Sequence, residues 1–159
     1  MRTSKFLKLR IVLAIVTLSV FSCVVISCNE DSPDNTPYTL SGNASGSQVV
    51  PSVTGTGSGT ISGNYNPQSR VLTYSSTWTG LTGAPTSGGF YIGASGVPGG
   101  SVGDPFTIAG GAYTSGSANG TMTLTEEQAT QLISGNWYYT YKTVANPGGE
   151  VRGQVSATR

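Results

Sequence analysis

The stretch from Val71 to Leu81 alternates two kinds of side chain, and this alternation constrains the fold more than any other feature. One set holds the larger side chains and a serine: Leu72, Tyr74, Ser76 and Trp78. The other set holds only hydroxyl side chains: Thr73, Ser75, Thr77 and Thr79. Because successive side chains of a strand point to opposite faces, the pattern predicts a half-buried β-strand with Leu72, Tyr74 and Trp78 inward. Turn residues at 64–69 precede it and predict a hairpin with residues 55–65.

Short runs of this kind recur from Tyr38 onward, separated by clusters of Gly, Pro, Asn and Ser. Their spacing predicts an all-β domain, a sandwich or barrel of short antiparallel strands. Residues 136–144 predict a strand with aromatics on both faces, so its inward face stays open. Residues 146–149 (NPGG) predict a turn before a last strand at 150–157. The two faces of that last strand are expected to carry Val151, Gly153 and Val155 on one side and Glu150, Arg152 and Gln154 on the other.

One short helix, at about residues 125–134, interrupts the β pattern. Thr125 and Gln128 are spaced as a capping box, in which each side chain bonds a backbone N–H of the first turn. Gly135 suits the C-terminal stop. We expect the helix to pack across an open end of the β core through an apolar stripe of Ala129, Leu132 and Ile133.

Charge is sparse and excludes one class of partner. After position 28 the chain keeps four basic residues against seven acidic ones, a formal net charge of −3. A protein that tracks phosphates needs clustered Lys and Arg, so no nucleic-acid partner is expected. All 23 glycines also lie after position 28. Low charge and scattered aromatics nevertheless favour a folded domain over a disordered tract.

The N-terminus has the order of a secretory signal. Residues 1–10 are basic and residues 11–25 are mainly apolar. The run ends in Val25-Ile26-Ser27-Cys28, which resembles the bacterial lipobox. That resemblance implies a signal peptide at 1–27, acylation of Cys28 and cleavage before it. Cys23 follows the bulky Phe21 and fits less well, and an uncleaved transmembrane anchor is the competing interpretation.

Residues 28–37 form an acidic, Pro-containing segment that predicts a flexible tether. Acidic residues directly after the lipidated Cys28 also resemble the surface-export signal of one Gram-negative group. The expected organisation is therefore signal, tether and a β domain at 38–156. The expected location is the bacterial cell envelope, as an outer membrane lipoprotein that is surface-exposed if the acidic segment is an export signal and not only a tether. The expected partner is the membrane itself, to which the lipid on Cys28 would attach the protein.

The order of segments resembles the CHRD domain, first named from chordin. The segments that carry the resemblance are Leu40-Ser41-Gly42, residues 48–53, Leu72-Thr73-Tyr74, residues 78–83, residues 120–125 and residues 145–154 (ANPGGEVRGQ). The closing segment is the most specific of them. The resemblance implies an immunoglobulin-like sandwich or barrel. Bacterial members lack a settled activity, and the animal namesake acts through protein binding.

The chain departs from that family at several positions. Relatives often carry histidines where this chain has Phe90, Ile92 and Lys142, and this chain has no histidine at all. If relatives bind metal there, this chain has lost the ligands, because Phe and Ile cannot coordinate and Lys repels a cation. Residues 43–47 also look inserted, and Val49 stands where relatives often have Glu. We therefore expect no metal and no cofactor.

Two sets of residues are candidates for a binding surface. Tyr91, Tyr113, Tyr138 and Lys142 could form an aromatic surface for a sugar or peptide, and ordinary β packing is the alternative. Glu150 and Arg152 stand two apart on one strand face. They could belong to a ligand site or could be a structural pair, with hydrogen bonds to a nearby loop.

No catalytic residue is assigned. Without His the chain has neither a Ser-His-Asp triad nor an imidazole base. The predicted function is a lipid-anchored envelope protein that acts as a non-enzymatic module for a protein or glycan partner. The alternatives are a hydrolase with paired carboxylates among Asp104 and Glu150, and a structural envelope protein without a specific ligand.

Overall fold

The computed structural model describes residues 34–108 and 113–159. The predictions for the signal peptide and Cys28 lie outside these residues. The described residues form eight strands: β1 (Tyr38–Ser45), β2 (Ser58–Asn66), β3 (Val71–Thr79), β4 (Pro85–Ile92), β5 (Ser101–Val102), β6 (Gly116–Thr123), β7 (Trp137–Thr143) and β8 (Val151–Thr158). A short 3-10 turn, η1 (Gly46–Gln48), follows β1, and one helix, α2 (Glu126–Ile133), precedes β7.

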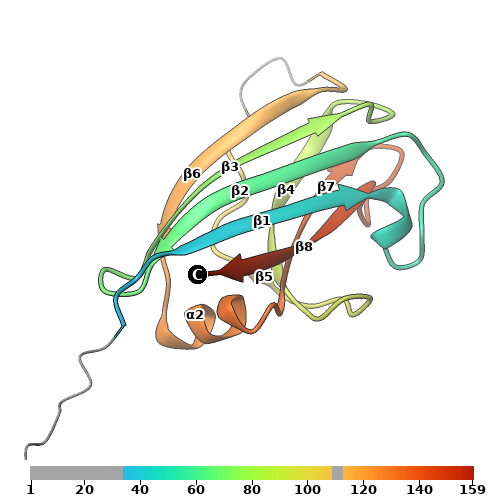
Figure 1. The fold of residues 1–159 in the computed structure, drawn as a ribbon. Coiled ribbons are helices and arrows are strands. Elements are labelled where there is room, and N and C mark those ends of the chain that lie inside the picture. The colour runs from blue at the N-terminus through green and yellow to red at the C-terminus, as the bar shows by residue number, and fades with distance from the viewer. Residues whose placement is uncertain (1–33, 109–112) are drawn as a thin grey trace, which may run out of the picture. The chain divides into compact units, whose positions relative to one another are not determined.

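All eight strands belong to one sheet, in the order β5-β4-β7-β8-β1-β2-β3-β6. Every paired neighbour runs antiparallel. Figure 1 shows the sheet curling so that β6 and β3 arch over β4 and β7. The all-β class with a single short helix is confirmed. One continuous curled sheet is closer to the barrel than to the two-sheet sandwich, because β1 and β8 are hydrogen-bonded where a sandwich would divide.

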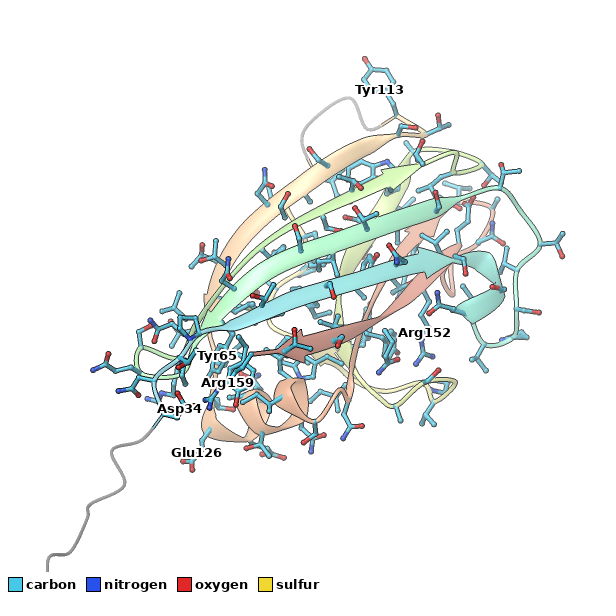
Figure 2. The ribbon with its side chains drawn as sticks, in the orientation of Figure 1. Asp34, Tyr65, Tyr113, Glu126, Arg152 and Arg159 are labelled. Carbon is cyan, nitrogen blue, oxygen red and sulfur yellow. The ribbon has the colours of Figure 1, made fainter. Side chains whose placement is uncertain are left out.

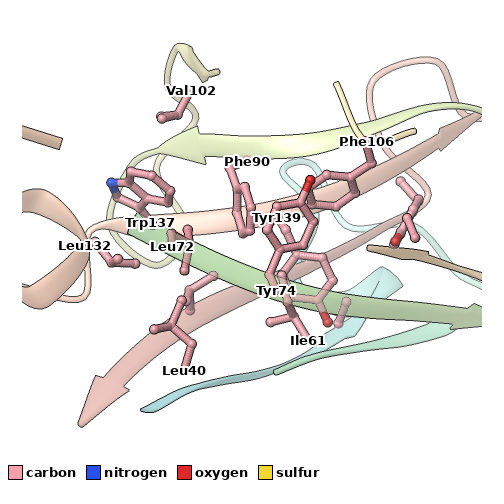
Figure 3. Packing of buried hydrophobic residues seen from close by; sticks show 14 of the residues in the cluster. Leu40, Ile61, Leu72, Tyr74, Phe90, Val102, Phe106, Leu132, Trp137 and Tyr139 are labelled. Carbon is pink, nitrogen blue, oxygen red and sulfur yellow. The ribbon is translucent and has the colours of Figure 1, made fainter. Parts of the chain in front are cut away.

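The predicted alternation of β3 is confirmed. Leu72, Tyr74 and Trp78 are buried inside the curl, and the hairpin with β2 forms in continuous register. The rings of Tyr74, Phe90 and Phe106 meet there at centroid separations of 4.9 to 5.1 Å (Figure 3). Burial of large aromatic side chains is a main source of stability in a domain that contains little aliphatic side chain.

Strand β7 is buried on both faces, which explains its unusual composition. Trp137, Tyr139 and Tyr141 point into the core and are 0 % exposed. Tyr138 and Thr140 point to the other face, yet they are only 6 % and 5 % exposed. Segment 93–99 lies over that outer face. Side chains of β8 hold it there by donating hydrogen bonds to its backbone carbonyls. Aromatics on both faces therefore reflect two covered faces.

The outer face of β1, β2, β3 and β6 carries short polar side chains in register. One row across the four strands is Asn43, Thr60, Thr77 and Ser117, and the next is Ser41, Ser62, Ser75 and Asn119. The hydroxyls of Thr60 and Thr77 lie 2.7 Å apart and share a hydrogen bond. On the solvent-facing side of this half of the sheet, Ser, Thr and Asn thus take the place that charged residues often have.

Helix α2 begins and ends as the sequence predicts. Thr125 and Gln128 form the reciprocal capping box, and Gly135 takes a φ of 72° after the last turn. Leu132 is fully buried against the core near Trp137 (Figure 3), so the helix covers one end of the curl. The expectation for Ile133 is wrong, because its side chain is 38 % exposed. Within the described ranges, no helix is long and apolar enough to cross a membrane.

Candidate functional site

A pocket of about 210 Å³ opens on the outer face of β4, β7 and β8. Four of the six residues predicted for a binding surface line it: Tyr91, Tyr138, Lys142 and Arg152. They come from three neighbouring strands and all point away from the core, because each alternates with a buried core residue. We call this cavity the outer pocket.

The two tyrosines of the outer pocket form a stacked pair. Tyr91 and Tyr138 are direct cross-strand partners on β4 and β7. Their ring centroids lie 5.3 Å apart and their planes differ by 14°. The Tyr138 hydroxyl accepts a hydrogen bond from the backbone N–H of Gly99, at 3.1 Å. This bond fixes one wall of the pocket, while the Tyr91 ring stays partly open to solvent.

Two cations flank the stacked rings. The Arg152 guanidinium carbon lies 3.7 Å from the Tyr138 ring centroid, and the Lys142 ammonium lies 5.3 Å from that of Tyr91. Such cation–π contacts strengthen when they are shielded from water. Arg152 is only 4 % exposed, and burial lowers the pKa of its guanidinium, against the opposing influence of Tyr138. Its Nη2 donates to the carbonyls of Ala94 and Val97, both at 2.9 Å.

Glu150 does not lie beside Arg152, so their predicted placement on one strand face is wrong. The Glu150 N–H bonds the carbonyl of Tyr141, whose cross-strand partner is Val151, so two β8-side residues oppose one on β7. This bulge breaks the alternation at the start of β8. It turns the Glu150 carboxylate away from Arg152 toward Thr82 and Thr143.

The Glu150 carboxylate is held by a network of donors. It accepts from the Thr82 N–H at 2.6 Å, the Thr82 hydroxyl at 2.7 Å and the Thr143 hydroxyl at 2.6 Å. Burial alone would raise its pKa. The hydrogen bonds from Thr143, Thr82 and Asn146 outweigh that effect and hold the pKa below its ordinary value of 4.5. The network matches the structural interpretation, hydrogen bonding to a nearby loop.

Two further candidates lie elsewhere. Tyr113, 76 % exposed, projects from the loop before β6, on another part of the domain from Arg152 (Figure 2). Asp104 lines a small hollow between β4 and β5. Neither residue lines the outer pocket, and Glu150 lines neither cavity. Asp104 and Glu150 therefore do not line either of these two cavities together, and the Glu150 carboxylate is engaged by Thr82 and Thr143.

The profile of the CHRD domain family matches residues 40–155. The chain belongs to the CHRD family. No curated protein and no solved structure matches the chain. The match runs from the third residue of β1 into β8 and includes every residue that lines the outer pocket, so the pocket lies wholly within the CHRD domain.

The three positions at which the family resemblance implies histidine do not form one site in this CHRD domain. Phe90 is 1 % exposed and belongs to the core, and Ile92 packs against the core from the same strand face. Lys142 lies on the other face, beside the Tyr91 ring. Among residues 34–108 and 113–159, no three His, Cys, Asp or Glu side chains lie close enough to hold a metal ion.

Sequence reasoning missed the rest of the pocket wall. Thr140 lies between Tyr138 and Lys142 on the same face of β7, and the period of two could have identified it. The remaining wall comes from residues 49–50, residues 98–99 and Gly148. These segments are far apart in the chain and carry no shared motif. Only the CHRD fold brings them together.

Proposed function

We propose that this CHRD-domain chain is a lipid-anchored protein of the bacterial cell envelope whose domain binds a protein or glycan without catalysing a reaction. The outer pocket carries this proposal: two stacked tyrosines and two cations converge on one cavity. Ligand sites are typically concave and combine aromatic walls with a few fixed polar groups. The lipobox-like sequence ending at Cys28 supports the anchor.

The proposal that the domain is not an enzyme rests on the contacts that Glu150, Arg152 and Lys142 make. Glu150, which could have served as a catalytic acid or base, instead holds β8 to the segment after β3. Arg152 and Lys142 are cations suited to binding and to charge complementarity. The pocket thus has the groups of a recognition site.

Ligand capture by the full-length chain in detergent tests the proposal. The wild-type chain is applied to a glycan array and, in parallel, cross-linked to envelope extract through a photoreactive group near the pocket. We expect a specific ligand whose capture is lost in Lys142→Met and kept in Arg70→Met. Arg70 is exposed and does not line the pocket, so both variants lose one positive charge but only one alters the site.

Equal capture by both variants would contradict a role for the pocket. Capture of nothing specific by the wild-type chain would leave a structural envelope protein as the better description. Turnover of a captured glycan, detected as a shift in its mass, would contradict the non-enzymatic assignment.

A further inference from the structure

We infer that the outer pocket binds the carboxylate of an acidic sugar residue at the end of a glycan chain. The inference rests on the proposed function and narrows it from a protein or glycan partner to one chemical class. Four observations support it: the charge of the pocket, the fixed orientation of Arg152, the volume of the cavity and the position of the pocket on the sheet.

The outer pocket carries two positive charges and has no acidic side chain in the described part of its lining to neutralise them. Lys142 and Arg152 line it, and none of its lining residues in the described part of the chain is acidic. Glu150, the acid nearest along the chain to Arg152, is turned away and engaged by Thr82 and Thr143. A buried cation without an ion-pair partner is costly, and an anionic ligand would remove that cost. The pocket therefore selects an anion.

Arg152 is oriented before any ligand arrives. Its Nη2 hydrogens are bonded to the carbonyls of Ala94 and Val97, and its plane rests on the Tyr138 ring. The Nε and Nη1 hydrogens have no bonded acceptor among the described residues. Both two-donor edges of a guanidinium include Nη2, whose hydrogens are already bonded here, so Nε and Nη1 can each give a single charge-assisted hydrogen bond to a carboxylate oxygen. Because the side chain is already fixed, little rotamer entropy is lost on binding.

The size of the cavity sets how much of a ligand it can hold. Its volume is about 210 Å³, below the ~300–1,000 Å³ that is usual for sites of drug-sized ligands. A cavity of this size holds a single small unit. We therefore infer a terminal residue, with the rest of the chain lying outside in solvent.

The surroundings favour a sugar over a peptide terminus. Peptide carboxylates are commonly captured by nests of free backbone N–H groups, and extended peptides add to sheet edges. The Gly99 N–H at this pocket already donates to Tyr138, and the pocket lies over β7, an interior strand of the sheet. The partly open Tyr91 ring instead offers a flat apolar face on which the C–H face of a sugar ring can pack.

Matched ligands give the sharpest test. Oligosaccharides that end in glucuronate, in its methyl ester or in glucose differ only at one carbon, and each is titrated calorimetrically into the full-length chain in detergent. A second series, ending in galacturonate, its methyl ester or galactose, repeats the comparison. In at least one series we expect the acid to bind about ten- to a hundredfold more tightly than its ester or neutral sugar, as for a hydrogen bond to a charged group. Added salt should weaken binding of the acid.

Variants of the chain separate the pocket from the general charge of the protein. Lys142→Met should lose most of the preference for the acid, Lys142→Arg should keep it, and Arg70→Met should bind like the wild type. Equal binding of acid and ester, or an unchanged preference in Lys142→Met, would overturn the inference. Capture of a neutral glycan or a protein at the pocket would also overturn it but leave the proposed function intact. Absence of any pocket-dependent ligand would overturn both.

Discussion

The carboxylate of Glu150 accepts a hydrogen bond from the backbone N–H of Thr82 at 2.6 Å. The two residues are 68 positions apart, so the bond ties the start of β8 to the segment that follows β3. The Thr143 hydroxyl donates to the same carboxylate from β7. One anion, at the end of the NPGGE segment, therefore connects three segments of the chain.

Replacing this anion should destabilise the domain. Glu150→Gln presents an amide nitrogen where two hydroxyls and an N–H now donate, and we expect the free energy of unfolding to fall by about 1–3 kcal/mol. Urea denaturation of the wild type and of Glu150→Gln at neutral pH measures this difference in the free energy of unfolding. Asp104→Asn is the control, because Asp104 is exposed and its loss of charge should change stability little. An equal effect of both substitutions would contradict the role given to the Glu150 network.

The same carboxylate predicts a dependence on acid. The folded-state pKa of Glu150 is held below its ordinary value of 4.5, so the unfolded chain takes up the proton first as the pH falls. Stability from this group is thus present at neutral pH and is lost between about pH 5 and the lower folded-state pKa. Urea denaturation across that range should show a steeper loss in the wild type than in Glu150→Gln. Parallel profiles would contradict the prediction.

A hydroxyl pair inside the core links β7 to β3. Tyr141 donates to the Ser76 hydroxyl at 2.8 Å, and Ser76 donates to the carbonyl of Thr60 at 3.0 Å. Tyr141→Phe should lower the free energy of unfolding by about 1 kcal/mol, because Ser76 loses a buried partner. Ser76→Ala should act similarly, and the double variant should lose less than the sum of the two. Strict additivity would show that the hydroxyls are not coupled.

Alkaline titration tests the burial of that tyrosine. Burial raises the pKa of Tyr141 to about 12, although the Ser76 hydrogen bond opposes this and nearby Tyr74 adds to it. The folded state therefore favours the neutral phenol, and its stabilising effect is lost as the pH rises from about 10, where the unfolded chain ionises, toward 12. Urea denaturation between about pH 10 and pH 12 should show that the free energy of unfolding falls with pH in the wild type and falls less in Tyr141→Phe.

Gly153 allows β1 and β7 to approach β8 closely. A Cβ at this position would lie 2.6 Å from the carbonyl oxygen of Asn43 and 2.7 Å from a ring carbon of Tyr139. Gly153→Ala should therefore cost about 1–3 kcal/mol of stability, because neither neighbour can move aside freely. Gly55→Ala is the matched control, since nothing lies within 4 Å of its Cβ. A thermal melt that shifts equally for both would contradict the steric explanation.

The sequence predicts those elements whose two faces differ. In β3 one face is buried and the other carries hydroxyls in solvent, so the period of two identifies Leu72 and Trp78 as core residues. In β7 the period fails, because segment 93–99 covers the outer face and buries Tyr138 as well. That cover depends on hydrogen bonds from Arg152 and Gln154 to carbonyls of segment 93–97, more than fifty positions earlier, which no local pattern encodes.

The candidate site was predictable in part for the same reason. Tyr138 and Lys142 were candidates as part of an aromatic surface that also carried a cation, and only Arg152 was placed on a strand face by alternation. The placement of Glu150 was wrong because the chain bulges where it enters β8, which directs the Glu150 carboxylate to Thr82 and Thr143 instead of to the face of Arg152. A bulge depends on the partner strand and on Gly149, whose φ of 135° suits only glycine, and the sequence pattern alone did not predict it.

The lipid anchor is tested through its two cysteines. If Cys28 is acylated, Cys28→Ala should abolish incorporation of labelled palmitate and leave an unprocessed chain that keeps residues 1–27, because cleavage before Cys28 follows acylation. Several acyl chains hold a protein stably in a bilayer, each buried CH₂ contributing roughly 0.8 kcal/mol, so the wild-type chain should fractionate with the membrane. Cys23→Ala is the matched control, because Cys23 would be removed with the signal peptide. Loss of label in Cys23→Ala instead would move the acylation site to Cys23. A wild-type chain that stays in the membrane without label and keeps residues 1–27 would favour the uncleaved anchor.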